Sequence, residues 1–590
     1  MLSNLSIDQV LSKARSHAKK GEVVEAQKLY EGILQNFSQN KRAQQGLADL
    51  TKINQNQNIQ DPPQALLDQL INLYNQGHYS VVVEQAEALS NQYPNSFMVW
   101  NILSVSAAEI GNHDQAIIAY NKVISLKPDH AEAYSNMSVS LQEQGKLNEA
   151  VEACKKAILF NPNYAKAYFN MGIALKNQGK LDEALDAYNK SISLNPNHPE
   201  IYSNIGVVLQ DLGKLDEALD AYNKALALKP SYPLAYHNIG VVLNEQGKSN
   251  DAITSCNKAL ALEPDYADAH FTLSYSLFQS GRIKEGLEEY EWRQKTKKGL
   301  SIHRHFRQPM WDGQASLKDK TLFLWCEQGI GDTMNWSYCL PFLTSCSKHV
   351  ILECQEKLVP LLSRSFPNVE VRSEDRRLDA ERDDFDLHLP MGSLYKHFID
   401  EITEKGKADF YLIPDPERVK FWKERLSSVG KGPYVGLCWK SSVKSAYRLQ
   451  HYPPISDWSP VFKIPDVTFI NLQYTDYEED IVTIQKEFGV TVHNFKDIDQ
   501  YDDIDEVAAL CSALDVVVST KATPPMISAG VGTLTKIANW RQSNFNNILN
   551  NPQSKALKMI HRDTLEPWDK VFNLIADDIL KLKLKSLIKK

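Results

Sequence analysis

The sequence is poor in cysteine. Eight of the 590 residues are cysteine, and they form neither a CxxC pair nor the regular spacing of a disulfide framework. Six of them lie among apolar neighbours, which is typical of buried free thiols: Cys326, Cys339, Cys346, Cys354, Cys438 and Cys511. A reducing, cytoplasmic location is therefore expected.

The chain also lacks a basic excess, a long apolar run and several short enzyme motifs. The formal net charge of -8 argues against a dedicated nucleic-acid binder, because phosphate neutralisation needs a basic face. No apolar run is long enough to span a bilayer, and no signal peptide is evident. The sequence has no Walker A loop, no complete GxGxxG and no HExxH. The acidic pairs in Asp383–Asp386 and Asp497–Asp499 are interpreted as strand-flanking and loop acids, so no metal site is predicted.

The first half is strongly periodic. Glycine recurs every 34 residues at Gly77, Gly111, Gly145, Gly179, Gly213, Gly247 and Gly281. Proline keeps the same step from Pro94 to Pro264, where it ends one helix and starts the next unit. An alanine follows most of these glycines by five residues, where two helices must approach each other. The pattern resembles the tetratricopeptide repeat, with one divergent copy near Gly21.

Four asparagines share one register of the repeats, nine residues before a glycine: Asn136, Asn170, Asn204 and Asn238. Asparagine is a poor interior helix former, so a row of them suggests a polar stripe on the concave face. Their amides could hold an extended peptide by its backbone. The row resembles the asparagine ladder of protein O-GlcNAc transferases. A solvated polar face in recently duplicated repeats is the alternative.

The second half changes character after Gly281. Short apolar runs alternate with helical patterns, which predicts parallel strands covered on both faces. The predicted strands are Thr321–Cys326, His349–Cys354, Asp384–Pro390, Tyr434–Trp439, Val467–Gln473, Asp515–Ser519 and Thr533–Ala538. A helix at Pro416–Ser428, capped by Asp415, separates the first three strands from the others. This order predicts two Rossmann-like halves.

Three sequence blocks suggest a family. They are W-D-G with E-Q-G-x-G-D-T and L-P, then VGLCWK with HYPPISDW, then DDIDEVAALCSALDVVVS with AGVGT. Together they resemble the C-terminal region of bacterial tetratricopeptide proteins with a GT-B glycosyltransferase domain, which is similar to heptosyltransferases. The expected fold is thus an all-α repeat solenoid followed by an α/β GT-B domain. The expected divisions are 1–53 for N-terminal helices, 65–298 for the repeats, 299–320 for a linker, and 321–414 and 415–590 for the two halves.

The resemblance assigns a catalytic role to the first block. Gly329 and Gly331 end a predicted strand, where ligands bind in doubly wound sheets. The acid of the G-D element is the implied general base, which is Asp332 in this chain. Its alternative role is a helix N-cap. Glu327 is the second candidate base, and its alternative is a loop carboxylate paired with a cation.

The other two blocks are assigned to the donor. The resemblance implies that Lys440 and Arg448 contact the phosphates of a nucleotide-sugar, with Lys444 and Gln473 as further candidates. The alternatives are a solvated basic loop for the lysines and an ordinary polar strand end for Gln473. Ser519, Thr520 and Thr523 precede a helix, whose N-terminus is a natural anion site. Here the chain departs from the family, because Pro524 and Pro525 remove two N–H donors; Lys521 could compensate by its charge.

Two kinds of function follow from these observations. The first is a metal-independent, inverting glycosyltransferase that uses a nucleotide-sugar and acts on a protein or peptide held by the repeats. A transferase for a glycan or lipid-linked acceptor is a variant of it. The second is a non-catalytic adaptor whose GT-B domain is degenerate. No cofactor, nucleic acid or membrane span is predicted.

Overall fold

The computed structural model describes residues 6–19, 23–37, 39–57, 61–441, 452–539, 553–562 and 566–588. The chain divides into two compact units, Met1–Asn204 and Ile205–Lys590, and each is described by itself. Arg448 and Lys444 lie outside the described residues. Within the described residues, no helix is both long and apolar enough to cross a membrane.

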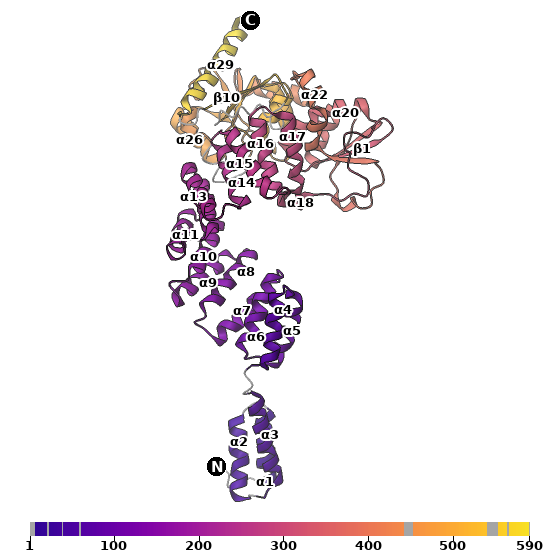
Figure 1. Cartoon of the computed structure of the whole chain (residues 1–590). Helices are drawn as coiled ribbons and strands as arrows, with labels where there is room; N and C mark the ends of the chain where they lie inside the picture. The colour runs from indigo at the N-terminus through magenta and orange to yellow at the C-terminus, as the bar shows by residue number, and fades with distance from the viewer. Residues whose placement is uncertain are drawn as a thin grey trace. The chain divides into compact units, whose positions relative to one another are not determined.

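The first unit is helical throughout its described residues (Figure 1). Its helices are α1 (Ile7–Lys19), α2 (Val23–Asn36), α3 (Lys41–Gln57), α4 (Gln64–Asn75), α5 (Tyr79–Gln92), α6 (Phe97–Glu109), α7 (His113–Leu126), α8 (Ala131–Glu143), α9 (Leu147–Phe160), α10 (Ala165–Asn177), α11 (Leu181–Leu194) and the start of α12 (Pro199–Asp211). Sequential helices pack in pairs, as in a solenoid of helical repeats.

The periodic glycines make the turns within the helix pairs. Gly111, Gly145 and Gly179 have φ values of 75°, 73° and 77°, in the left-handed region that glycine tolerates best. The alanines that follow are fully buried, as Ala116 is. Side-chain size is matched between paired helices: a Cβ on Gly172 would lie 2.5 Å from the buried ring of Tyr188. The predicted solenoid is therefore confirmed.

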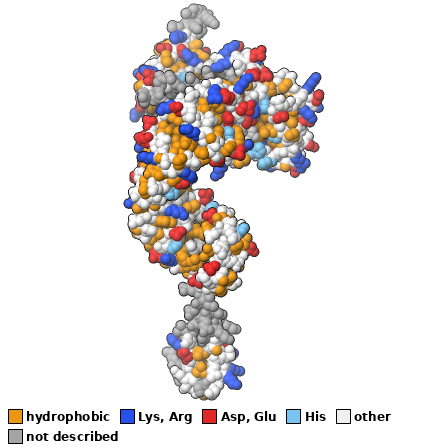
Figure 2. Space-filling model, viewed as in Figure 1, with side chains coloured by type: hydrophobic (Ala, Val, Ile, Leu, Met, Phe, Trp, Pro, Cys, Tyr) orange, Lys and Arg blue, Asp and Glu red, His pale blue; other side chains and the backbone are white. Residues whose placement is uncertain are grey.

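The second unit begins with the remaining repeats. They comprise the rest of α12, α13 (Leu215–Leu228), α14 (Pro233–Glu245), α15 (Ser249–Leu262), α16 (Ala267–Gln279), α17 (Ile283–Tyr290), η1 (Glu291–Lys295) and α18 (Lys297–Ile302). On the face shown in Figure 2, acidic and basic side chains are interspersed over this unit. This face therefore shows no broad area of a single charge sign among the described residues.

Two sheets of parallel strands follow. The first has the order β3-β2-β1-β4 and the second the order β10-β9-β8-β5-β6-β7. The strands are β1 (Thr321–Trp325), β2 (His349–Cys354), β3 (Glu370–Ser373), β4 (Leu387–Pro390), β5 (Tyr434–Cys438), β6 (Thr468–Asn471), β7 (Val492–His493), β8 (Val516–Ser519), β9 (Leu534–Asn539) and β10 (Leu557–His561). The seven predicted strands are found; the short or partly exposed β3, β7 and β10 were not predicted.

Helices lie between successive strands as far as β9, and α29 follows β10. In the first half they are α19 (Ile330–Trp336), η2 (Ser337–Cys339), α20 (Leu340–Cys346), η3 (Glu356–Leu358), α21 (Val359–Ser365), η4 (Arg376–Leu378), η5 (Met391–Ser393) and α22 (Leu394–Lys405). In the second half they are α23 (Pro416–Val429), η6 (Ile455–Trp458), α25 (Ser459–Phe462), α26 (Glu478–Phe488), α27 (Ile504–Ala513), α28 (Thr523–Gly530) and α29 (Asp569–Ile588). Asp415 caps α23 through the N–H groups of Glu417 and Arg418, as predicted.

The segment 299–320, expected to be a linker, is built into the first half. The buried Arg304 guanidinium donates to the carboxylate of Glu353 on β2 at 2.6 Å and also pairs with Asp379. The N–H of Trp311 donates to the carbonyl of His388 on β4 at 2.9 Å. A buried charge is costly unless it is paired, and Arg304 is paired with Glu353 and Asp379. The segment is therefore held to the first half by specific bonds.

One of the cysteine predictions is wrong. Cys346 is exposed, while the other seven cysteines are buried and free. It lies at the end of α20, next to the exposed Ser345, where the helix leaves the core. Apolar neighbours in the sequence did not reveal that this helical turn faces outward.

We expect Trp422→Ala to destabilise the second half by about 3–5 kcal/mol, the usual cost of removing a large buried aromatic side chain. Trp422 is fully buried on α23, packs edge-to-face against Phe495, and donates its Nε1–H to Glu506 at 2.9 Å. The adjacent Phe421 is 38% exposed, so Phe421→Ala is the matched control. Calorimetry measures the melting temperature of each variant, and equal melting temperatures for Trp422→Ala and Phe421→Ala would contradict the packing.

Candidate functional site

The loop after β1 brings Asp332 to the edge of the first sheet. Gly329 is the N-cap of α19 and offers no side-chain cap, and Asp332 is the third residue of the helix. Asp332 is therefore not the N-cap, which was its alternative role. The first turn of a helix still favours a negative charge there. Its carboxylate is half-buried rather than enclosed.

In each sheet the strand order reverses direction at one strand, and the loop after that strand lies near Asp332. In the first sheet β1 lies between β2 and β4, and in the second β5 lies between β6 and β8. Beyond the carboxyl ends of such strands, parallel sheets leave a crevice for ligands. The loops after β1, β2, β5, β6 and β8 all meet there, and they come from both halves.

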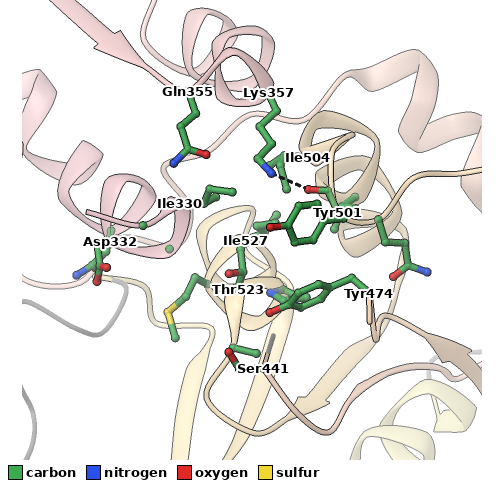
Figure 3. Close-up of a pocket in the computed structure, with 18 of the residues that line it drawn as sticks. Ile330, Asp332, Gln355, Lys357, Ser441, Tyr474, Tyr501, Ile504, Thr523 and Ile527 are labelled. Carbon is green, nitrogen blue, oxygen red and sulfur yellow. Dashed lines mark hydrogen bonds between the residues drawn. The ribbon is translucent and has the colours of Figure 1, made fainter. Parts of the chain in front are cut away.

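A cavity of about 430 Å³ occupies this crevice. Gln355 and Lys357 lie on one wall, with Ser441 and Tyr474 across from them and Asp332 at one end (Figure 3). The remaining lining residues include Gly329, Gly331, Gln500, Tyr501, Lys521, Thr523 and Met526. Its size is within the range of small-molecule sites.

Lys357 connects the two halves at this cavity. Its Nζ donates to the carbonyl of Tyr501 and to Asp502, at 3.0 Å in each case (Figure 3). Behind it, the Arg364 guanidinium makes two bonds to Asp505 at 2.7 and 2.6 Å. These pairs link β2–α21 of the first half to α27 of the second, and they define the width of the crevice.

A second cavity of about 1000 Å³ lies between the last repeat and the first half. Phe271 and Tyr275 of α16 line it on one side, and Trp325 and Gln328 on the other. Helix α18 supplies much of the rim, including Lys297 and Lys298. Three residues line both cavities: Gly329, Asp332 and Lys521.

Glu327 is held by a buried ion pair. Its Oε1 accepts from the guanidinium Nη2 of Arg293 at 2.9 Å and from the N–H of Gly392 at 3.1 Å. The side chains of Arg293 and Glu327 are only 5% and 4% exposed. Burial raises the pKa of Glu327, while the Arg293 charge opposes that shift. Glu327 was expected either to act as a base or to pair with a cation, and Arg293 is that cation. Glu327 also lines the second cavity.

Two tyrosines of the last repeat approach the Asp332 loop. The Nε2 of Gln328 donates to the hydroxyl of Tyr290 at 2.7 Å. Burial first, and then the nearby Asp332 carboxylate, raise the pKa of Tyr275 to about 12, so this hydroxyl stays protonated near neutral pH. Neither residue was predicted as part of the site: Tyr290 is at a core position of the repeat pattern, and Tyr275 is a half-buried residue of α16.

The predicted donor residues after β5 and β6 are mainly engaged within the protein. Lys440 Nζ pairs with Asp480 at 2.6 Å and does not line the cavity; its neighbour Ser441 does. Gln473 is fully buried, and its Oε1 accepts the N–H groups of Trp439 and Lys440 at 3.1 and 2.9 Å. Gln473 therefore fixes the backbone of the loop after β5 and does not face the cavity.

The residues after β8 divide into buried and lining groups. Ser519 and Thr520 are buried, and Ser519 Oγ donates to the carbonyl of Thr520 at 2.7 Å. Thr523, the first residue of α28, lines the crevice together with Pro524. Of the three predicted residues, only Thr523 thus lines the crevice cavity. Lys521, two residues earlier in the chain, lines both the crevice cavity and the second cavity.

The asparagines of the repeats differ in their surroundings. Asn170 is buried, and its Nδ2 donates to the carbonyl and hydroxyl of Ser135 at 3.1 Å. The Nδ2 of Asn204 donates to the carbonyl of Glu200 at 2.9 Å. Asn136 accepts from Lys166 at 3.0 Å, and Asn238 is half-buried beside His237. Asn170 alone of the four is thus buried, whereas Asn136, Asn204 and Asn238 keep partial exposure.

Sequence reasoning missed several residues of the crevice. Gln355 and Lys357 follow β2, Tyr474 follows β6, and Tyr501 lies between β7 and α27. Their position after these strands was the available signal, since the carboxyl ends of parallel strands share an edge. Among the described residues, no cluster of three or more His, Cys, Asp or Glu side chains could hold a metal ion.

Comparisons with known proteins identify the repeats. Family models described as tetratricopeptide repeat match residues 165–198 and 233–266, residues 187–220 and residues 99–130. A model described as TPR repeat matches residues 140–179 and 211–247. Tetratricopeptide repeats are therefore shown for residues 99–130 and 140–266.

Individual proteins resemble parts of the chain. Protein FlbA of Caulobacter vibrioides is 35% identical over 280 residues, which are 44% of this chain and 46% of that protein. The match thus spans about half the length of this curated relative. The crystal structure of MamA is 29% identical, covers 29% of this chain and 93% of that chain, and has a TM-score of 0.26. YrrB, described as a TPR protein with an unusual peptide-binding site, is 21% identical over 31% of this chain and 94% of its own, with a TM-score of 0.26.

We expect Arg293→Met to destabilise the junction of the last repeat and the first half by about 3–5 kcal/mol, because it leaves Glu327 buried without its cation. The double variant with Glu327→Gln should recover a large part of that loss. Lys295→Met, at an exposed neighbouring position, is the control. Thermal unfolding measures all three; an unaffected Arg293→Met protein would show that the pair does not hold the junction.

Proposed function

We propose that this protein is a GT-B glycosyltransferase that moves a sugar from a nucleotide-sugar to a hydroxyl of a protein or peptide. The observation that supports this best is the position of Asp332, which lines both the crevice between the halves and the cavity beside the last repeat. The crevice would take the donor, and the second cavity the acceptor. The carboxylate would then lie where the two substrates react.

Asp332 is the proposed general base. The acceptor oxygen attacks the anomeric carbon, its proton passes to the Asp332 carboxylate, and the bond from that carbon to the diphosphate oxygen breaks. The nucleoside diphosphate leaves with the bonding electrons. A single displacement of this kind inverts the anomeric carbon. The neutral Tyr275 beside Asp332 adds no competing negative charge.

Lys521 is the proposed contact for the leaving diphosphate. Stabilising the charge that develops on the leaving group is the main task of such a site. Pro524 and Pro525 withhold N–H groups from the first turn of α28, so that turn offers few donors. Lys521 is adjacent to this turn and lines both cavities. It can therefore supply the positive charge that the backbone does not.

A non-catalytic adaptor is the second candidate. The two prolines favour it, since they weaken the anion site that a donor would need, and Lys440 is already paired with Asp480. The repeats would then bind a protein partner, and the crevice would stay unused.

Calorimetry with nucleotide-sugars based on UDP, GDP, ADP, CMP and dTDP distinguishes these functions. Binding of one donor, with release of its nucleotide (the monophosphate from a CMP-sugar, the diphosphate from the others), supports the transferase; no heat with any donor favours the adaptor. Mass spectrometry of cells with and without the chain then identifies the acceptor. A sugar added to proteins supports the proposal, whereas a changed glycan or lipid alone would replace the protein acceptor.

We expect Asp332→Asn to bind the donor normally and to lose transfer by about 10²–10⁴-fold or more, the usual contribution of a general base. Calorimetry measures binding, and release of nucleoside diphosphate measures turnover. Asp319→Asn, an exposed carboxylate before β1, is the control and should remain active. Unchanged turnover in Asp332→Asn rules out its role as the base.

We expect Lys521→Ala to weaken donor binding and lower transfer by about 10- to 100-fold, because charge-assisted hydrogen bonds contribute about 1.5–3 kcal/mol. Titration with the nucleoside diphosphate alone isolates the phosphate contact. Lys463→Ala, an exposed lysine in the same half, should bind as the wild type does. Equal affinities of the Lys521→Ala variant and the wild type would remove this residue from the site.

A further inference from the structure

The rim of the second cavity is basic. Lys297 and Lys298 are exposed on α18, and the described structure records no ion pair for either. Lys521 and Asp332 also line this cavity. The acidic lining residues are Asp268, Asp332 and Glu327, and Glu327 is already neutralised by Arg293. Apart from the proposed base, Asp268 is therefore the lining carboxylate that can offset Lys297 and Lys298.

The position of the two lysines is set by tight packing. Thr296 caps α18 by accepting from the N–H of Gly299 at 3.0 Å, and a Cβ on Gly299 would lie 2.0 Å from the carbonyl of Arg293. Helix α18 is thus pressed against η1, the segment that also contributes Arg293 to the buried pair with Glu327. Lys297 and Lys298 consequently have a defined place beside the loop that precedes Asp332.

The size and lining of the cavity suit a polypeptide. Its volume of about 1000 Å³ is at the upper limit for small-molecule sites, and a single sugar would fill little of it. Phe271 and Tyr275 come from α16, a helix of the repeats, and repeat arrays bind extended partners along their surface. Aromatic groups with a few charged ones can hold both the side chains and the backbone of a peptide segment.

We propose that this cavity selects acceptor polypeptides with acidic residues next to the hydroxyl that receives the sugar, and that Lys297 and Lys298 determine this preference. The proposal rests on the proposed function, because it names the acceptor of that reaction. An acidic flank would pair with the two lysines while the hydroxyl reaches Asp332. A basic flank would meet like charges and lose affinity.

The test is a binding experiment with the full chain that does not depend on transfer. Three pools of fluorescent peptides carry a central serine flanked by Asp and Glu, by Lys and Arg, or by Ala and Gln. In fluorescence polarisation at low salt, we expect the acidic pool to bind about 3- to 10-fold more tightly than the neutral one, as exposed ion pairs allow. Added salt should reduce this difference.

Charge variants locate the effect. In K297E/K298E the preference should reverse toward the basic pool, and in K297A/K298A it should disappear. K295E is the matched control: Lys295 is also exposed on the same segment, lies over the ring of Trp292 and does not line the cavity. Equal binding of the three pools, or a preference that K297E/K298E does not change, would overturn the proposal.

Two further arms separate the possible failures. A uronic-acid oligosaccharide that binds as tightly as the acidic peptides would overturn the assignment to a polypeptide. If the acidic preference follows Lys297 and Lys298 but no donor binds in calorimetry, the transferase fails and so does the claim that the peptide is its acceptor. If a donor binds and is used while the peptide pools bind equally, only this inference fails.

Discussion

Arg293 and Glu327 meet inside the second unit, and the geometry of the site depends on that pair. Arg293 follows the last repeat helix, and Glu327 begins the loop that leads to Asp332. Glu327 could not stay buried alone, and Arg293, which also pairs with Glu291 at 2.6 Å, neutralises it and holds it in place. The pair therefore couples the end of the repeats to the loop after β1. A repeat array attached by a flexible segment would give Asp332 no fixed neighbour such as Tyr275.

The parallel sheets supply the other constraint. Because all strands of a sheet point the same way, the loops at their carboxyl ends gather on one edge. Two such edges face each other in this protein, joined by Lys357 to Asp502 and by Arg364 to Asp505. The crevice is thus a consequence of strand direction, and the side chains that line it come from at least five different loops.

Much of the fold could be predicted from the sequence, and less of the site. The repeat period was visible because each copy reuses one turn glycine and one set of small residues. Strands β1 and β2 were visible as continuous apolar runs. The partly exposed β3 and the two-residue β7 have no such run, so no local pattern could reveal them. The segment around Arg304 resembled a linker because its partners, Glu353 and Asp379, lie far away in the chain.

By itself, the sequence determined the helical repeats, seven of the ten described strands, and that Asp332 follows a strand near two glycines. These properties depend on neighbours a few residues apart, and periodicity records them directly. Only the tertiary structure decided that Glu327 is paired with Arg293, that Gln473 faces inward, and that Lys521 lies with Asp332 between two cavities. Such relations depend on how distant segments pack against one another, and a burial or pairing partner that is remote along the chain leaves no local pattern.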